Sequence, residues 1–149
     1  MQIAAKILVS LGGIGFIRPA SATWGSAAAG VALYYLFPTT ELSIKLIAIA
    51  AVFVIGVGAA QYVESKSKTH DPHFIVIDEL VGMMIVSMFL DQIWWQFVLA
   101  FLLFRLFDIA KLWPASIFDK KSGGFSVMID DVFMAIPALA ILQIILSYV

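Results

Sequence analysis

The stretch LSIKLIAIAAVFVIGVGAAQYV, residues 42–63, decides the fold class of this chain. It is mostly apolar, its one charged residue, Lys45, lies near its start, and it matches the roughly 20 residues that a helix needs to cross a bilayer. The composition agrees, because 62% of the 149 residues are hydrophobic and only 13% are charged. A soluble domain carries about 25% charged residues, and a chain this small could not bury the apolar excess. The sequence therefore predicts an integral membrane protein.

Five further apolar segments predict additional helices. They are residues 3–17, 26–37, 80–90, 92–107 and 132–149. Segment 132–149 contains Pro137, a predicted kink, and segment 3–17 is interrupted by glycines, which indicates either a re-entrant or a surface helix. We expect one all-α, membrane-embedded domain over residues 1–149, a polytopic protein with about four to six membrane-embedded helices.

The charged residues indicate which side of the membrane carries the chemistry. We thread the five segments that follow residues 3–17, including 42–63, up and down through the membrane. The turns at 38–41 and at Asp91 then fall on one side. Segments 18–25, 64–78 and 109–130 fall on the other, with most of the Lys, Arg, Asp and Glu residues. An excess of Lys and Arg in short loops marks the cytoplasmic side. We therefore expect a multi-pass protein whose motif loops and active site face the cytoplasm.

Charge and cysteine content exclude several classes of function. The net charge of -1 argues against a nucleic-acid partner, which would require a basic surface. The chain has no cysteine, so disulfides, thiolate-bound zinc and a cysteine nucleophile are excluded. Residues 1–10 lack a cleavage site typical of a signal peptide, and we expect them to remain part of the protein.

The most informative polar motif is HDPHFIVIDELVG, residues 70–82. Pro72 disfavours a helix at Asp71, so His70 and Asp71 are predicted in a loop. Asp78 and Glu79 would open the next helix, where the helix dipole favours carboxylates, and they could be capping residues. The apolar run before them favours a functional interpretation, because it draws the pair towards the bilayer.

A second motif ends segment 92–107. Arg105, Asp108 and Lys111 follow one another at i, i+3 and i+6, so that neighbouring members are within side-chain reach. The structural interpretation is a local salt bridge, with Lys111 reaching the membrane interface. The functional interpretation is favoured, because an ionisable residue in a spanning helix is costly.

Two further motifs contain small residues next to apolar helices. In GGFSVMIDD, residues 123–131, the glycines allow close approach to a ligand or metal. Its adjacent carboxylates, Asp130 and Asp131, repel each other unless a cation offsets their charge. In SATWGS, residues 21–26, Thr23 and Ser26 are either simple caps or a phosphate-binding helix start.

Together these motifs predict metal-assisted phosphoryl transfer. Magnesium prefers carboxylates, water and substrate phosphate, and the motifs also contain cations and a histidine. Positioning and charge neutralisation account for most of the catalysis in such reactions.

These residues resemble the phosphatidylglycerophosphatase A family of bacteria. The family pattern HDPxxIVxDExxG is matched by residues 70–82, and FRxFDxxKPxP is matched at Phe104, Arg105, Phe107, Asp108, Lys111 and Pro114. GGxGIMxDD is matched at Gly123, Gly124, Met128, Asp130 and Asp131, and PGTxGS at Thr23, Gly25 and Ser26. The chain departs from these patterns at Ser21, Ala22, Leu112 and Ser126, which puts loop geometry in question more than the reaction.

The resemblance implies hydrolysis of phosphatidylglycerophosphate to phosphatidylglycerol and phosphate with Mg²⁺, in the bacterial inner membrane. Its implied metal ligands are Asp78, Glu79, Asp130 and Asp131, with Asp108 as a further ligand or an orienting residue. Arg105 and Lys111 would hold the phosphate with Thr23 and Ser26, while His70 or Asp71 would move the proton. Direct attack by water and a phosphoenzyme both stay open, as does the oligomeric state.

Competing functions are disfavoured by sequence. A CDP-alcohol phosphotransferase would require a DGxxAR motif, and histidine-dependent lipid phosphatases require a PSGH element; the chain has neither. A cation channel or transporter would distribute its charges through the bilayer, typically in repeated halves. The motif charges of this chain cluster at one predicted face, without a repeat.

Overall fold

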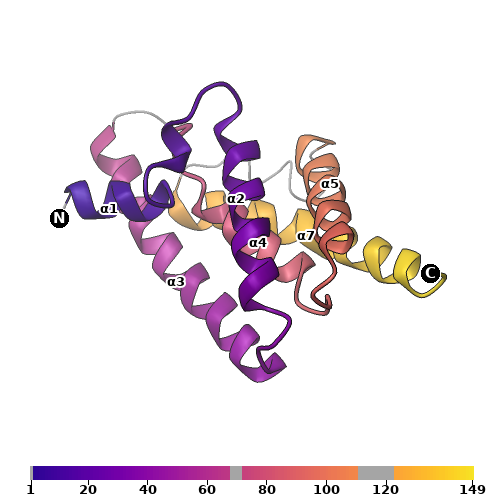
Figure 1. Ribbon diagram of the computed structural model, residues 1–149. Helices are drawn as coiled ribbons and strands as arrows, with labels where there is room; N and C mark the ends of the chain where they lie inside the picture. Colours follow the sequence, from indigo (N-terminus) through magenta and orange to yellow (C-terminus); the bar gives the residue numbers. More distant parts are fainter. Residues whose placement is uncertain (1, 68–71, 111–122) are drawn as a thin grey trace.

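The regular structure of the chain is helical. The computed structural model describes residues 2–67, 72–110 and 123–149 (Figure 1). The elements are α1 (Gln2–Val9), the 3₁₀ turn η1 (Ile14–Phe16), α2 (Ser21–Leu36), α3 (Leu42–Ser67), α4 (Ile77–Val86), α5 (Trp94–Ala110) and α7 (Gly124–Leu146). These three ranges contain no strand, which confirms the all-α prediction for the described part of the chain.

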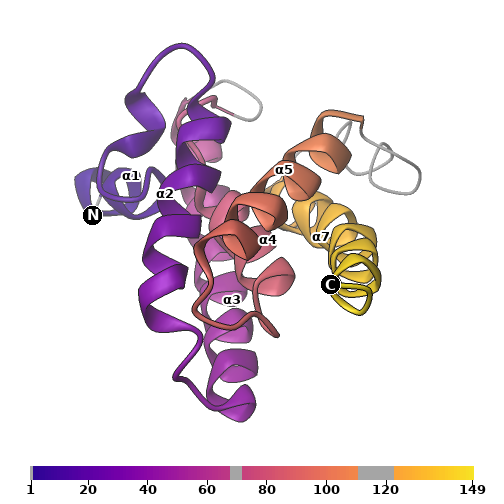
Figure 2. The same ribbon diagram turned by 45° about the vertical axis from the view of Figure 1, so that its right-hand side comes forward.

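Helix α4 is the interior helix of the bundle. It contacts α2, α3, α5 and α7, and Figures 1 and 2 both show it among these helices. Val81, Met83 and Val86 are completely buried there. Because the first turn of α4 carries Asp78 and Glu79, the fold buries the Glu79 carboxylate and leaves Asp78 half-buried beside it.

Two helices are long and apolar enough to cross a membrane. They are α3, with 26 residues, and α7, with 23 residues. On α3, Ile47 and Val54 are each 69% exposed. Large exposed apolar surfaces are typical of regions that contact a membrane or another protein. These two helices indicate membrane association. The helices α2, α4 and α5 have 16, 10 and 17 residues and are shorter than these two. The expected total of about four to six membrane-embedded helices therefore stays a prediction.

Hydrogen bonds between turns define one end of the bundle. The Lys45 ammonium, in the first turn of α3, donates to the carbonyl of Met88 just after α4, at 2.8 Å. The Gln92 amide lies 3.4 Å from the carbonyl of Tyr34, near the end of α2. The turns after α2 and after α4 therefore lie together, as the up-and-down threading predicts.

The opposite end, which we call the site end, gathers the remaining helix termini. The Ser26 hydroxyl of α2 donates to Glu79 of α4 at 2.6 Å. The backbone N–H of Gly123, which precedes α7, donates to Glu64 near the end of α3 at 2.8 Å. The described parts of the motif segments thus share one end of the molecule.

Two helices begin earlier than the sequence analysis expects. α2 begins at Ser21, not near residue 26, so Thr23 lies in its first turn. α7 begins at Gly124, not near residue 132, so Asp130 and Asp131 lie inside a helix and not ahead of one. α7 also continues through Pro137 without interruption, because an inserted proline is tolerated where neighbouring groups satisfy the backbone.

The segment 3–17 forms two short elements. α1 ends at Val9, whose carbonyl accepts a hydrogen bond of 2.8 Å from the N–H of Val76, next to the start of α4. Gly12 and Gly13, with φ of 71° and 105°, make the turn that leads to η1. α1 packs beside α3 (Figure 1). With eight residues it is too short to span a bilayer, and it fixes the entry to α4.

Candidate active site

Glu79 is the centre of the polar cluster at the site end. The helix dipole favours a carboxylate in the first turn of α4, but here the side chain is also buried. It receives a hydrogen bond from the Ser26 hydroxyl at 2.6 Å and an ion pair from the Arg105 guanidinium, whose Nη1 lies 2.8 and 3.0 Å from the two carboxylate oxygens. One carboxylate thus joins α2, α4 and α5.

Arg105 pairs with a second carboxylate. Its Nη1 lies 2.7 Å from Oδ2 of Asp108, at the predicted i, i+3 spacing on α5. The local salt bridge predicted from sequence is therefore present, and the longer-range pair with Glu79 adds to it. Two acidic partners hold the guanidinium in a fixed position at the site end.

Asp130 and Asp131 bring further buried acidity to the same place. Both lie on α7 and are 7% and 4% exposed. Asp131 interacts electrostatically with Glu79, Asp78 and Asp108, so these groups are near neighbours. The Oδ2 atom of Asp131 is buried and has no hydrogen-bond partner among the described residues. Buried carboxylates from three helices therefore converge around Arg105.

This convergence changes the ionisation of Glu79. Burial raises the pKa of Glu79 to about 7, and the Asp108 charge acts in the same direction. Arg105 and the Ser26 hydroxyl act in the opposite direction. Burial thus disfavours the ionised form of Glu79, and the paired Arg105 favours it.

The four buried carboxylates of the cluster exceed the positive charge that Arg105 supplies. The set is Glu79, Asp108, Asp130 and Asp131. The described residues contain no group of three acidic or histidine side chains close enough to hold a metal ion by themselves. Mg²⁺ usually binds through one or two carboxylates together with waters and substrate phosphate. The donor set and the partnerless Asp131 oxygen therefore fit a magnesium site completed by substrate.

Asp78 and Thr23 occupy the edge of the cluster. The half-buried Asp78 side chain lies in the first turn of α4 and accepts a hydrogen bond of 3.0 Å from the N–H of Glu79. Thr23 is half-buried and lies one turn before Ser26 on α2. The other predicted site residues, His70, Asp71 and Lys111, lie outside the described residues.

Two of the motif glycines, Gly82 and Gly124, pack helices together, and the expected close approach of a ligand or metal at residues 123 and 124 stays a prediction. A Cβ on Gly124 would lie 2.1 Å from the carbonyl oxygen of Val57 on α3, and one on Gly82 would lie 2.3 Å from the ring of Phe104 on α5. Neither site has room for a side chain. The glycines fix the spacing of α7 and α4 against their neighbours, and thereby the positions of the carboxylates.

Two positioning residues were missed by the motif analysis. Gln61 accepts a hydrogen bond from the N–H of Gly124 at 2.9 Å, and Glu64 accepts one from the N–H of Gly123 at 2.8 Å. Gly123 has a φ of 117°, which favours glycine. The sequence contains one signal for these two residues, since Gln61 and Glu64 are polar and lie at the end of the apolar run 42–63.

The fold and site define a class of protein. The described residues combine two candidate membrane spans with a buried acidic cluster and a paired arginine at one end, and acidic residues with a cation are the groups that phosphoryl-transfer enzymes use. The family model of phosphatidylglycerophosphatase A matches residues 7–146. The chain therefore belongs to the phosphatidylglycerophosphatase A family, as its motifs predict, and is an enzyme of the phosphatase class.

Individual relatives cover most of the chain. A phosphatidylglycerophosphatase A of Haemophilus influenzae is 41% identical over 131 residues, 87% of this chain and 80% of its own length. One of Escherichia coli is 34% identical over 125 residues, 83% of this chain and 72% of its own. A Bacteroides thetaiotaomicron protein named "Putative phosphatidylinositol-3-phosphatase" is 34% identical over 146 residues, 93% of this chain and 91% of its own. No solved structure matches the chain.

Proposed function

We propose that this protein hydrolyses the phosphate monoester of phosphatidylglycerophosphate, giving phosphatidylglycerol and phosphate, with Mg²⁺ and at the cytoplasmic face of the bacterial inner membrane. The single observation that carries the proposal is the junction of Ser26, Glu79 and Arg105, where three family motifs meet through hydrogen bonds of 2.6–3.0 Å. The three motifs are far apart in the sequence, and a common role in binding and hydrolysing a phosphate ester explains why their side chains meet.

Arg105 has the geometry of a phosphate-binding residue. Its contacts with Glu79 and Asp108 all use Nη1, so the other terminal nitrogen would donate to a phosphate oxygen. A guanidinium presents its donors in a planar fork that suits phosphate. Glu79 and Asp108 orient this fork, and Ser26 in turn holds Glu79.

The acidic residues would hold the metal ion. Asp131, Asp130 and Glu79 are its proposed ligands, with Asp78 and Asp108 at the edge of the site. When bound, Mg²⁺ neutralises the charge that builds on the phosphoryl oxygens and makes the phosphorus more electrophilic.

The reaction breaks the bond between phosphorus and the oxygen of the lipid headgroup. That oxygen takes up a proton, for which His70 or Asp71 is the proposed source. The new phosphorus–oxygen bond comes from water, either directly or after transfer to a carboxylate. Arg105 remains paired throughout and keeps the phosphate in position for attack.

A second candidate substrate is a phosphoinositide, because the Bacteroides relative is named as a phosphatidylinositol-3-phosphatase. The two are separated by phosphate release from purified protein in mixed micelles. We expect phosphatidylglycerophosphate to be hydrolysed with a kcat/KM about tenfold or more above that of phosphatidylinositol 3-phosphate or phosphatidic acid, the scale of discrimination available from one differing group. A preference for the phosphoinositide would replace the proposed substrate.

A further inference from the structure

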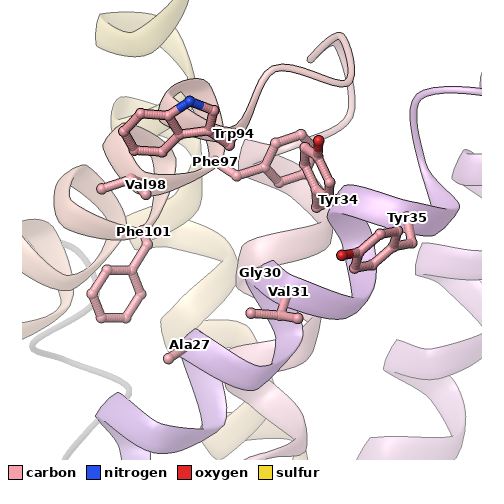
Figure 3. A pocket seen from close by; sticks show the side chains of 9 residues that line it. All are labelled: Ala27, Gly30, Val31, Tyr34, Tyr35, Trp94, Phe97, Val98 and Phe101. Carbon is pink, nitrogen blue, oxygen red and sulfur yellow. The ribbon is translucent and has the colours of Figure 1, made fainter.

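A groove between α2 and α5 adjoins the polar cluster. It has a volume of about 380 Å³ and every residue that lines it is apolar or aromatic. Its α2 side includes Ala27, Val31 and Tyr35, and its α5 side includes Trp94, Val98 and Phe101. Figure 3 shows the two rows of side chains facing each other across the groove.

We propose that this groove binds one acyl chain of the phospholipid substrate, a proposal that rests on the proposed function. One end of the groove lies near the site, since Ala27 directly follows Ser26 on α2 and Phe101 lies one helical turn before Arg105 on α5. A lipid whose phosphate meets Arg105 would have its tail near this end of the groove.

The dimensions suit a single chain. From Ala27 to Tyr35 the groove follows α2 for roughly 12 Å, at 1.5 Å per helical residue. Tyr35 and Trp94, at the end remote from Arg105, are 67% and 69% exposed, so this end of the groove lies at the surface of the protein. A lipid could enter from the bilayer without leaving it.

The surroundings disfavour a second copy of this chain as the occupant. A stable protein–protein interface buries about 1,200–2,000 Å² in total, far more than the surface of nine groove residues. One end of the groove also lies near the polar cluster, a position that an acyl chain of the substrate requires and a dimer interface does not.

Two alanines on α2 provide a matched test. Ala27 lines the groove, whereas Ala32 is exposed and does not line it. A phenylalanine at Ala27 would fill the end of the groove nearest Arg105, while Ala32→Phe adds the same ring elsewhere. Val31→Trp, at a position 64% exposed, fills the middle of the groove and serves if Ala27→Phe fails to fold.

The first measurement is photolabelling. The probe is a diacylglycerol 3-phosphate with a diazirine midway along one acyl chain, in phosphatidylcholine vesicles with EDTA to prevent turnover. We expect labelled peptides from α2 and α5, reduced about tenfold by Ala27→Phe and unchanged by Ala32→Phe, because an overfilled apolar site rejects its ligand. Equal labelling of the exposed face of α3, or cross-links between two chains, would overturn the proposal.

The second measurement is chain-length preference. For dioleoyl against dihexanoyl phosphatidylglycerophosphate, Ala27→Phe should lower the ratio of kcat/KM values about tenfold, and Ala32→Phe should leave it at the wild-type value. An unchanged ratio in Ala27→Phe, with hydrolysis intact, rejects the groove and keeps the proposed function. If the wild type hydrolyses no lipid phosphate, the proposed function fails, and photolabelling alone decides whether the groove binds lipid.

Discussion

Asp131 is an acidic residue whose burial the described residues do not fully compensate. Its side chain is buried among other carboxylates, and its Oδ2 atom has no hydrogen-bond partner in the described part of the chain. Burying such a group reduces stability unless a cation binds it. A neutral side chain at position 131 would therefore give a more stable protein in the absence of a bound cation.

We therefore predict that Asp131→Asn lowers kcat/KM by about 100-fold or more, as when an electrostatic contribution at a reacting centre is removed. In EDTA the variant should unfold at the same temperature as the wild type or higher. Mg²⁺ should raise the unfolding temperature of the wild type, by mass action, and not that of the variant. An equal Mg²⁺ shift in both proteins would remove Asp131 from the metal site.

Arg105 yields a second prediction at this scale. Lys retains the charge but loses the planar fork, and Arg105 uses one nitrogen for both Glu79 and Asp108. Arg105→Lys should lower kcat/KM by about 100-fold while the protein remains folded in detergent. If Arg105 only balances charge, the lysine variant will keep near-normal turnover in the phosphate-release assay.

The double variant Arg105→Leu with Asp108→Leu separates structure from function further. It removes the local pair and leaves Glu79 with Ser26 as its hydrogen-bond donor. We expect a thermal unfolding temperature closer to the wild type than that of Arg105→Leu alone, because one unpaired buried charge is relieved. Activity should remain lost. Wild-type rates from this double variant would show that the pair is structural.

Sequence reasoning identified most of the cluster at the residue scale. Ser26, Glu79, Arg105 and Asp108 were all candidates, because charged and hydroxyl residues stand out in an apolar chain. The partnership of Glu79 with Arg105 could not be predicted, since it joins two helices whose packing is set by non-local contacts. The contacts of Gln61 and Glu64 with the start of α7 could not be predicted for the same reason, although both residues are polar and lie at the end of an apolar run.

At the scale of elements, close packing of α7 on α3 positions the acidic pair. A Cβ on Gly124 would lie 2.1 Å from the carbonyl oxygen of Val57, so the helices would have to separate. Gly58, on α3, has nothing within 4 Å of its hypothetical Cβ and is the matched control.

Gly124→Ala should reduce the free energy of unfolding by about 1–3 kcal/mol, the usual effect of overpacking, and should lower kcat by displacing Asp130 and Asp131. Gly58→Ala should be neutral or stabilising, because alanine favours helix by about 1 kcal/mol. Thermal unfolding and phosphate release measure both variants. Equal behaviour of the two alanine variants would mean that the contact at Gly124 does not position the site.

Helix boundaries were the least predictable feature at this scale. α3 begins at Leu42, as the apolar run indicates, but continues to Ser67 through polar residues. α2 and α7 begin in motif residues that resemble loop. For α7 the reason is tertiary, since Gln61 and Glu64 accept hydrogen bonds from the N–H groups at its start. Apolar periodicity locates the helix bodies, whereas contacts with other helices determine their ends.

For the whole molecule, the apolar composition predicts an all-helical, membrane-associated fold, and the described residues agree. The threading also predicts that the motif segments share one end, and the contacts of Ser26 with Glu79 and of Gly123 with Glu64 join their described parts there. The interior position of α4 was not evident, because a short apolar segment suits a core helix and a membrane helix equally well.

We propose that the site end of the bundle is a magnesium-dependent centre for phosphate-ester hydrolysis. The most direct measurement is phosphate release from phosphatidylglycerophosphate by the purified wild-type protein, as Mg²⁺ is titrated from excess EDTA upwards. The predicted result is no turnover in chelator, a saturable rise with Mg²⁺, and loss of turnover when EDTA is added again. Full turnover in excess chelator would contradict the claim.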